Sequence, residues 1–432
     1  MPYIRKSGHA DLPLHTGTVP RWLADRMRDL GREIIQAMLM EYGQKEVLSR
    51  LSDPLWFQSF GAVLGMDWHS SGITTSVLYA LKRGLNPLAK ELGLYVCGGR
   101  GKYSRQTPDE LLQIAEKTNL NGNELVRASR LSAKIDSTAV QDGFQLYQHN
   151  FILSSQGDWV VVQQGMNTEK KTARRYHWSS GEIKSFVEEP HTGVTGENQG
   201  SILNLTDSKA SPTRSSILTL SRENPEKTLG ELQKISSLGL PEKFVKEKSQ
   251  QLELFADENE ITKQELNVLV EGNERSIIMP EHHEVLAEDV NLKRLGAVLA
   301  TAYESQPQNF EGLLLTPGLG PRTLQSLTLV SEVIHGTPSR FTDPARFSFA
   351  HGGKDGHPFP VPTKIYDQSI RILGDSIEKA KLGYDDKSLC LKRLHTTALE
   401  IEKNCQPLAD FDATIAREKA NSRAWGGRTV GD

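Results

Sequence analysis

Two glycines separated by one residue interrupt a helical pattern in residues 308–334, QNFEGLLLTPGLGPRTLQSLTLVSEVI. Glycine in a helix interior costs about 1 kcal/mol relative to alanine, so the chain is expected to turn here rather than continue one helix. Gly318 and Gly320 permit a sharp turn, and Pro321 stands where the first turn of a new helix tolerates proline. The sequence therefore predicts two helices joined by a turn, with backbone N–H groups at the second helix able to bind a phosphate.

The stretch PGLGPRT resembles the helix-hairpin-helix motif of DNA repair proteins. The resemblance implies contacts to a DNA backbone that position a protein without reading bases. The residues that it assigns to DNA are Gly318, Gly320, Arg322 and Thr323. The alternative is a plain helical hairpin with a glycine turn.

The resemblance also extends to glycosylases of this motif class, in which a catalytic aspartate follows the hairpin by some two dozen residues. Asp343 follows Pro317 by 26 positions, residue 343 minus residue 317. Arg322 replaces the lysine of the bifunctional members, so the resemblance does not imply a Schiff-base lyase. A glycosylase that uses Asp343 remains an alternative.

The length of 432 residues suggests about two or three domains. No apolar run approaches the roughly 18 residues that cross a bilayer, and the first residues lack the apolar core of a secretory signal. We therefore expect a cytoplasmic protein without membrane contact. The cysteines Cys97, Cys390 and Cys405 form no CxxC pair, so neither disulfides nor a cysteine zinc site is indicated.

The spacing of apolar residues predicts an α+β fold. Residues 20–52 have helical periodicity, and residues 142–178 contain two β-rich runs around SSQGD, which predicts a hairpin. The expected order is a mixed N-terminal domain with a β-hairpin or small sheet at 1–191, a linker or long loop at 192–216, a mainly helical domain at 217–345 that includes the hairpin at 308–334, and a region at 346–432 with a Gly/Pro-rich loop, helices at about 365–383 and 388–403, and a polar tail.

The net charge of −3 argues against a protein that coats nucleic acid by bulk electrostatics, so a DNA site must be local. One basic cluster, Arg100, Lys102 and Arg105, lies in the glycine-rich stretch VCGGRGKYSRQTPDEL. This stretch suits a phosphate but does not match GxxxxGK[ST], so nucleotide hydrolysis is not expected. A second cluster contains Arg174 and Arg175. The alternative for each cluster is a solvated surface.

Several histidines stand beside small residues in short loop-like stretches, where chemistry is often located: His15, His69, His191 and His351. For any one of them a structural role is the alternative. Asp67 and His69 flank Trp68 in MDWHSSG, and alternate residues of an extended strand point the same way. This pair is a candidate to bind a divalent metal or to act as a base.

A second constellation contains Lys134 and Asp136 in SAKIDS and Asp142 in QDG, ahead of a strand that ends in two glutamines. The arrangement is similar to the sites of metal-dependent nucleases, although their E-x-K on the second strand is absent. His177 in RRYHW, after Arg174 and Arg175, is a candidate to hold a nucleic-acid backbone.

Long segments resemble the bacterial and archaeal proteins grouped as domain-of-unknown-function family 763. They are ADLPLHTG, LSDPLWFQSFG, DWHSSGITT, CGGRGKYSRQTP, QDGFQLYQHNF, VVVQQGM, ARRYHW, PGLGPRT and DPARFSFAHGGKDGHPFPV. The likeness runs from about residue 5 to 385. It implies a helix-hairpin-helix and no catalytic assignment.

The leading hypothesis is a metal-dependent nuclease acting on DNA ends or structured DNA in repair. Asp67, His69, Asp136 and Asp142 would hold Mg²⁺ or Mn²⁺, the metal would activate water, and Lys134 or a histidine such as His177 would handle charge at the phosphate. His15, His191, Asp343 and His351 form an alternative site. The alternatives are a non-catalytic DNA-binding adaptor for other repair proteins and the glycosylase. Substrate structure, metal identity, pathway and oligomeric state stay open.

Overall fold

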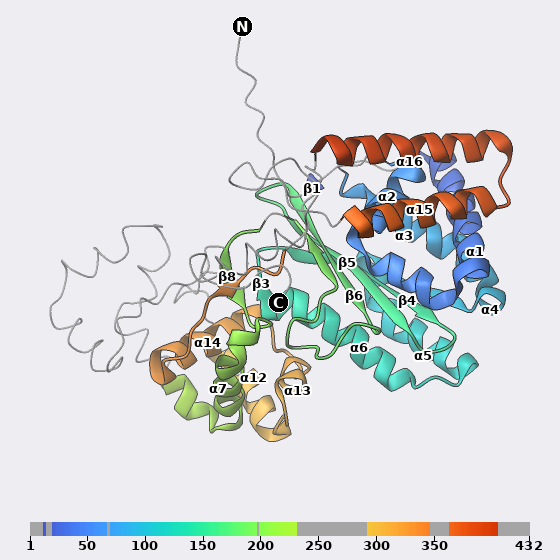
Figure 1. Cartoon of the computed structure of the whole chain (residues 1–432). Helices are drawn as coiled ribbons and strands as arrows, with labels where there is room; N and C mark the ends of the chain where they lie inside the picture. The colour runs from blue at the N-terminus through green and yellow to red at the C-terminus, as the bar shows by residue number, and fades with distance from the viewer. Residues whose placement is uncertain are drawn as a thin grey trace, which may run out of the picture.

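The computed structural model describes residues 12–13, 20–66, 70–196, 198–230, 292–345 and 363–404. These residues form a six-stranded sheet, a three-stranded sheet and surrounding helices, with a helical C-terminal region (Figure 1). The predicted α+β class is therefore confirmed. No helix in these ranges has the length and apolar character that a membrane span requires.

The large sheet has the strand order β1-β6-β5-β4-β2, with β7 paired to β6, and every pairing is antiparallel. The strands β4 and β5 form the hairpin predicted around SSQGD. The bounds are β1 Leu12–Pro13, β2 Leu94–Arg100, β4 Gln145–Ser154, β5 Trp159–Asn167, β6 Thr172–Ser179 and β7 Gly193–Thr195. The small sheet joins β3 Val140–Gln141, β8 Ser201–Asn204 and β9 Phe341–Thr342.

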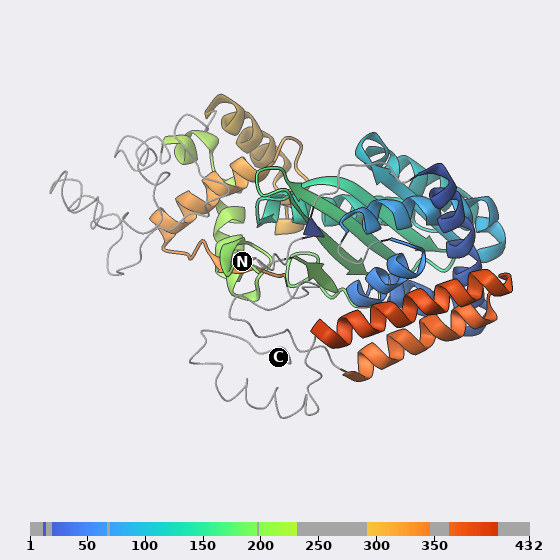
Figure 2. The ribbon, with the colours of Figure 1, turned by 90° about the horizontal axis from the view of Figure 1, so that it is seen from above.

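One helical layer covers one face of the large sheet, and it unites the first and last helices of the described chain (Figure 2). It contains α1 Arg21–Ser52, α2 Pro54–Val63, α3 Gly72–Leu85, α15 Thr363–Lys379 and α16 Tyr384–Asn404. In α1 most apolar residues repeat every three or four positions and are buried, as its sequence predicts, whereas Trp22 and Met40 are exposed. Val160 and Val162 of β5 point into this layer. The short elements η1 Asn86–Leu88 and α4 Ala89–Leu92 lead from α3 into β2.

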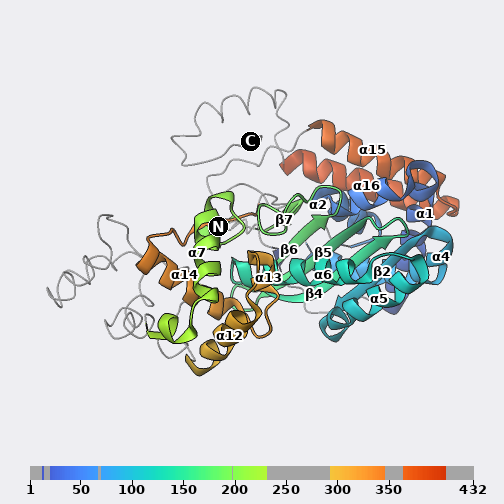
Figure 3. The same ribbon diagram turned by 90° about the horizontal axis from the view of Figure 1, so that it is seen from below.

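The opposite face of the sheet packs on a second group of helices (Figure 3). Val161, between the two valines of the first layer, points into this second core, as alternation along a strand requires. The elements on this side are η2 Gly101–Gln106, α5 Thr107–Thr118, α6 Gly122–Lys134, the π-helical η3 Ile135–Ala139, η4 Ser208–Ala210, α7 Ser211–Arg222, α12 Leu292–Ser305, α13 Phe310–Leu314 and α14 Pro321–His335.

The stretch 192–216 differs from the expected linker or loop, because it contains β7, β8, η4 and the start of α7. Its strands are only three and four residues long. They are specified by pairing with β6, β3 and β9, which a Ser, Thr and Gly rich composition does not reveal.

Candidate nucleic-acid interface

The helices α13 and α14 are joined by a turn with the geometry that the two glycines suggest. Gly318 has φ 80°, a left-handed value that favours glycine, and Gly320 is the N-cap of α14. The N-cap supplies no side-chain hydrogen bond to the first turn of the helix. Pro317, Gly318 and Arg322 are exposed, so the N-terminus of α14 faces solvent. This end of α14 is therefore able to receive an anion.

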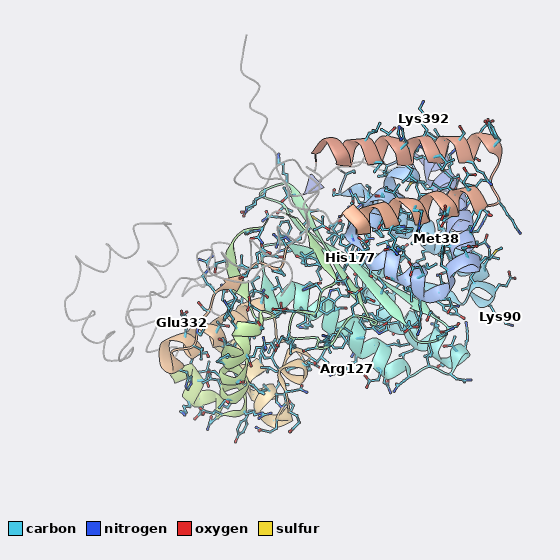
Figure 4. The ribbon with its side chains drawn as sticks, viewed as in Figure 1. Met38, Lys90, Arg127, His177, Glu332 and Lys392 are labelled. Carbon is cyan, nitrogen blue, oxygen red and sulfur yellow. The ribbon has the colours of Figure 1, made fainter. Side chains whose placement is uncertain are left out.

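The side of the turn that faces the protein interior is anchored to the second core. Leu319 is 2% exposed and packs among the apolar residues of that core. Lys134 Nζ donates a hydrogen bond to the Leu319 carbonyl oxygen, and Gln141 Nε2 donates to the Pro321 carbonyl oxygen at 3.0 Å. At the neighbouring helix, Arg127 of α6, labelled in Figure 4, pairs with Glu311 of α13. These contacts hold the turn in a fixed orientation on α6 and η3.

Lys134 was expected among the catalytic residues, and the structure places it beneath the turn instead. Burial lowers the pKa of its ammonium group, and this group donates its hydrogen bond to a backbone carbonyl oxygen. Lys134 and Gln141 lie 185 and 180 residues from their partners in the sequence. The roles of Lys134 and Gln141 as supports of the turn were missed, because no local pattern links positions so far apart.

One end of the large sheet is unusually polar, because the polar halves of three strands lie side by side. Antiparallel pairing aligns the start of β4 with the end of β5 and the start of β6. The interior there is filled by hydrogen-bonded side chains rather than apolar ones. The buried polar residues of this end are Gln148, His149, Asn150, Gln163, Gln164, Arg174 and Arg175.

On the α5–α6 side of this end, Arg174 joins two aspartates in what we call the buried ion cluster, Arg174, Asp142 and Asp343. Its guanidinium donates to both oxygens of Asp343 at 3.0 Å and to Asp142 Oδ2 at 2.9 Å. The Tyr176 hydroxyl also donates to Asp142 Oδ2, at 2.7 Å. Burial, with the neighbouring charge of Asp343, raises the pKa of Asp142 to about 6, although Arg174 opposes that shift.

Asp136 of η3 accepts hydrogen bonds from three buried side chains on the same side of the sheet. Its carboxylate contacts Gln163 Nε2, Trp178 Nε1 and His191 Nε2. Gln163 in turn accepts from His149 Nδ1 at 2.7 Å, which orients the His149 ring. His191 and Asp136, which come from different predicted sites, thus meet, and each carboxylate oxygen of Asp136 has a partner.

On the other side of the sheet, His177, labelled in Figure 4, and Arg175 are both buried beneath α1–α3. Arg175 Nε donates to His177 Nε2 at 2.9 Å, and His177 Nδ1 donates to the Leu51 carbonyl oxygen at 3.2 Å. Burial and the adjacent Arg175 hold the pKa of His177 well below its ordinary value, so the ring is neutral. Burial likewise lowers the pKa of Arg175 to about 9.

Burial argues against two of the predicted DNA contacts. Arg174 and Arg175 have no exposed surface, so neither reaches a DNA backbone in this structure. The same burial does not favour catalytic roles for Asp136, Asp142 and His177, or a glycosylase role for Asp343, because these groups are bonded to other interior side chains.

Only part of the predicted metal site lies within the described residues. Asp67, His69, His15 and His351 lie outside the described residues. Among the residues that are described, no three His, Cys, Asp or Glu side chains are arranged to hold a metal ion. Asp136 and Asp142, the two expected metal ligands that are described, bind separate sets of partners.

The remaining predicted DNA contacts, Arg100, Lys102 and Arg105, are exposed. They lie where β2 passes into η2, so the expected phosphate loop is partly an edge strand paired with β4. Arg100 lies over the ring of Tyr147, and Lys102 lies over the ring of Tyr103. The sequence interpretation missed both tyrosines. For Tyr103, the interleaving of basic and aromatic residues in GRGKYSR was a usable signal, whereas Tyr147 lies in strand β4, in QLYQHN.

Fold and site together define an α+β protein whose large sheet, polar at one end, lies between two helical layers, with an exposed glycine turn at a helix N-terminus. The chain belongs to the family described as "Protein of unknown function (DUF763)", which it matches over residues 8–361. No curated protein and no solved structure matches the chain.

Proposed function

We propose that this protein binds duplex DNA and that the turn between α13 and α14 contacts the phosphate backbone. The observation that carries the proposal is the exposed N-terminus of α14, which begins at a glycine without a capping side chain. A helix N-terminus in this state attracts phosphate through its N–H groups and its dipole. Exposed Arg322 adds a positive charge beside it.

Support for a fixed binding element comes from the contacts beneath the turn. The carbonyl groups of Leu319 and Pro321 are engaged by Lys134 and Gln141, so they point toward the protein. Leu319 is held in the core. A turn anchored in this way needs little reordering when DNA binds, which favours affinity. Because the contacts are to phosphate, we expect no sequence preference.

The proposed activity is binding rather than cleavage, because the predicted catalytic side chains Asp136, Asp142 and His177 are buried in the interior. Binding without cleavage corresponds to the adaptor hypothesis. Asp67 and His69 lie outside the described residues, so metal-dependent cleavage is assayed in the same experiment by adding Mg²⁺, Mn²⁺ or EDTA. A cleaved product that requires metal would add the nuclease to the proposal.

Binding of a fluorescent mixed-sequence duplex, measured by anisotropy, tests the proposal. Gly318→Val places a β-branched residue at φ 80° and its Cβ 3.2 Å from Val298 Cγ2, so the turn must shift. We expect the Kd to rise about 10-fold or more, since hydrogen bonds to a charged group contribute about 1.5–3 kcal/mol. Arg322→Ala should weaken binding and reduce the slope of log K against log salt by about 1.

The matched control is Gly336→Val at the opposite end of α14. Gly336 has φ 63°, so the same residue imposes a similar backbone strain there, in open space. We expect this variant to bind the duplex as the wild type does. Equal weakening by both glycine variants would show a general loss of α14, and unchanged binding by Gly318→Val would remove the turn from the interface.

A further inference from the structure

A second surface carries tyrosines paired with cations, on elements other than α13 and α14. We call it the tyrosine surface and define it by six residues: Tyr79, Tyr103, Tyr147, Arg100, Lys102 and Arg105. Arg100 lies 5.6 Å from the Tyr147 ring centre, and Lys102 lies 5.4 Å from that of Tyr103. Tyr79 of α3 has Arg83 at 5.4 Å. Tyr79 and Tyr103 are 57% and 51% exposed, which is unusual for large aromatic side chains.

These residues surround one end of strand β2. Lys82, three positions after Tyr79 on α3, donates to the Gly98 carbonyl oxygen at 2.8 Å, so this side of α3 borders β2. A Cβ at Gly99 would lie 3.1 Å from the Tyr103 Cβ, which shows that η2 folds back against the strand. Arg100 pairs with Gln148 in β4, next to Tyr147. The three tyrosines therefore lie around a common strand end.

The cations of this surface are available to an anion. Arg100, Lys102 and Arg105 are exposed, and none of them forms an ion pair with another residue in the described ranges. Nearby cations differ in this respect, because Lys82 pairs with Glu110 at 2.7 Å and Arg83 pairs with Asp25 at 2.9 Å. Three unpaired cations within six residues create a local positive potential in a chain whose net charge is −3.

We infer that the tyrosine surface binds an unpaired nucleic-acid strand. Exposed rings and guanidinium planes offer flat faces on which successive bases stack, and the cations contact the phosphates between them. A duplex hides its base faces within its own stack, so the rings give an advantage only with unpaired bases. The inference rests on the proposed function only in that both concern nucleic acid as the ligand. The residues of the tyrosine surface are different from those of the turn.

Anisotropy with fluorescent oligothymidylate, which forms no stable duplex with itself, tests the inference. We expect Tyr103→Ala and Tyr79→Ala each to raise the Kd at least about 5-fold, because stacking on one aromatic residue contributes about 1–3 kcal/mol per base. Tyr103→Phe keeps the ring and should bind as the wild type does. Lys102→Ala should reduce the salt slope by about 0.7, the value for one phosphate of a single strand.

The matched controls remove a tyrosine ring elsewhere on the protein. They are Tyr303→Ala on α12 and Tyr384→Ala on α16. These tyrosines are 44% and 86% exposed and lie outside the tyrosine surface. Circular dichroism checks that every variant is folded. Oligothymidylate binding that is weakened by Tyr103→Ala and Tyr79→Ala, but not by the controls, supports the inference. Equal binding by all variants overturns the inference. Displacement of the oligonucleotide by polyglutamate, together with no effect of the tyrosine changes, also overturns it.

The duplex experiment separates the two proposals. Duplex binding that depends on Gly318, without oligothymidylate binding, would leave the proposed function standing and overturn the tyrosine surface. Oligothymidylate binding that depends on Tyr103, without duplex binding, would do the reverse. Binding of neither probe would overturn both.

Discussion

Replacing Arg174 with leucine is expected to lower the free energy of unfolding by about 3–5 kcal/mol. Arg174 is the cation that pairs with both Asp142 and Asp343 in the buried ion cluster, and all three side chains are excluded from solvent. Removing one partner of a buried ion pair leaves an uncompensated charge, which is among the most destabilising single changes known. Here two carboxylates would remain together. Urea unfolding followed by circular dichroism and tryptophan fluorescence measures the change.

Lys227→Leu is the matched control, because it removes a cation of an exposed pair. Lys227 Nζ lies 2.8 Å from Glu223 Oε2, and the lysine side chain is mostly exposed. An exposed pair contributes about 0–1 kcal/mol, so this variant should unfold close to the wild type. If Arg174→Leu also stayed within about 1 kcal/mol of the wild type, the ion cluster would not be a structural element of the interior.

The ion cluster also links the large sheet to the segment that follows α14. Asp343 accepts hydrogen bonds from the backbone N–H groups of Gln199 and Ala345, each at 2.9 Å. Arg174 therefore fixes β6, the 198–200 stretch and the end of β9 to one another. Because α14 leads into this segment, the cluster and the Lys134 contact hold the proposed DNA-binding turn from two directions.

The sequence was most informative where structure is local. The apolar spacing of residues 20–52 predicted α1, SSQGD predicted the β4–β5 hairpin, and the glycines predicted the turn before α14. Each of these signals lies within a few residues of the element that it specifies. The predicted family is confirmed by the match over residues 8–361.

The sequence could not show which polar residues are interior. ARRYHW reads as a basic surface strand, yet Arg174 and Arg175 point to opposite faces of a sheet that is covered on both sides. The partners that make Arg174 acceptable inside, Asp142 and Asp343, lie 32 and 169 residues away in the sequence. The same limit applies to helix packing. The helices α15 and α16 complete the layer that α1 begins, and the periodicity of each helix does not indicate such long-range packing. Burial of charge depends on such distant partners, so local patterns misplace it.

Asp142→Asn is expected to become more stable relative to the wild type as the pH rises. The folded pKa of Asp142, about 6, is raised chiefly by burial above its ordinary value of 3.8. The folded state therefore binds this proton more tightly, and the resulting stability is full below about pH 4 and lost as the pH rises through about 6. Asparagine does not titrate, so its free energy of unfolding relative to the wild type should increase by about 2 kcal/mol between about pH 4 and pH 7.

Urea unfolding across this pH range measures the difference, with Asp385→Asn, which removes an exposed carboxyl of α16, as the matched control. A difference that stayed flat or fell with rising pH would contradict the buried, proton-binding state of Asp142. The same variant separates a structural carboxylate from a metal ligand, because a ligand that binds only the folded state stabilises it. If Mg²⁺ or Mn²⁺ stabilised the wild type but not Asp142→Asn at neutral pH, Asp142 would bind the metal of a nuclease. Equal responses would leave Asp142 as the carboxylate that, with Asp343, keeps Arg174 within the sheet.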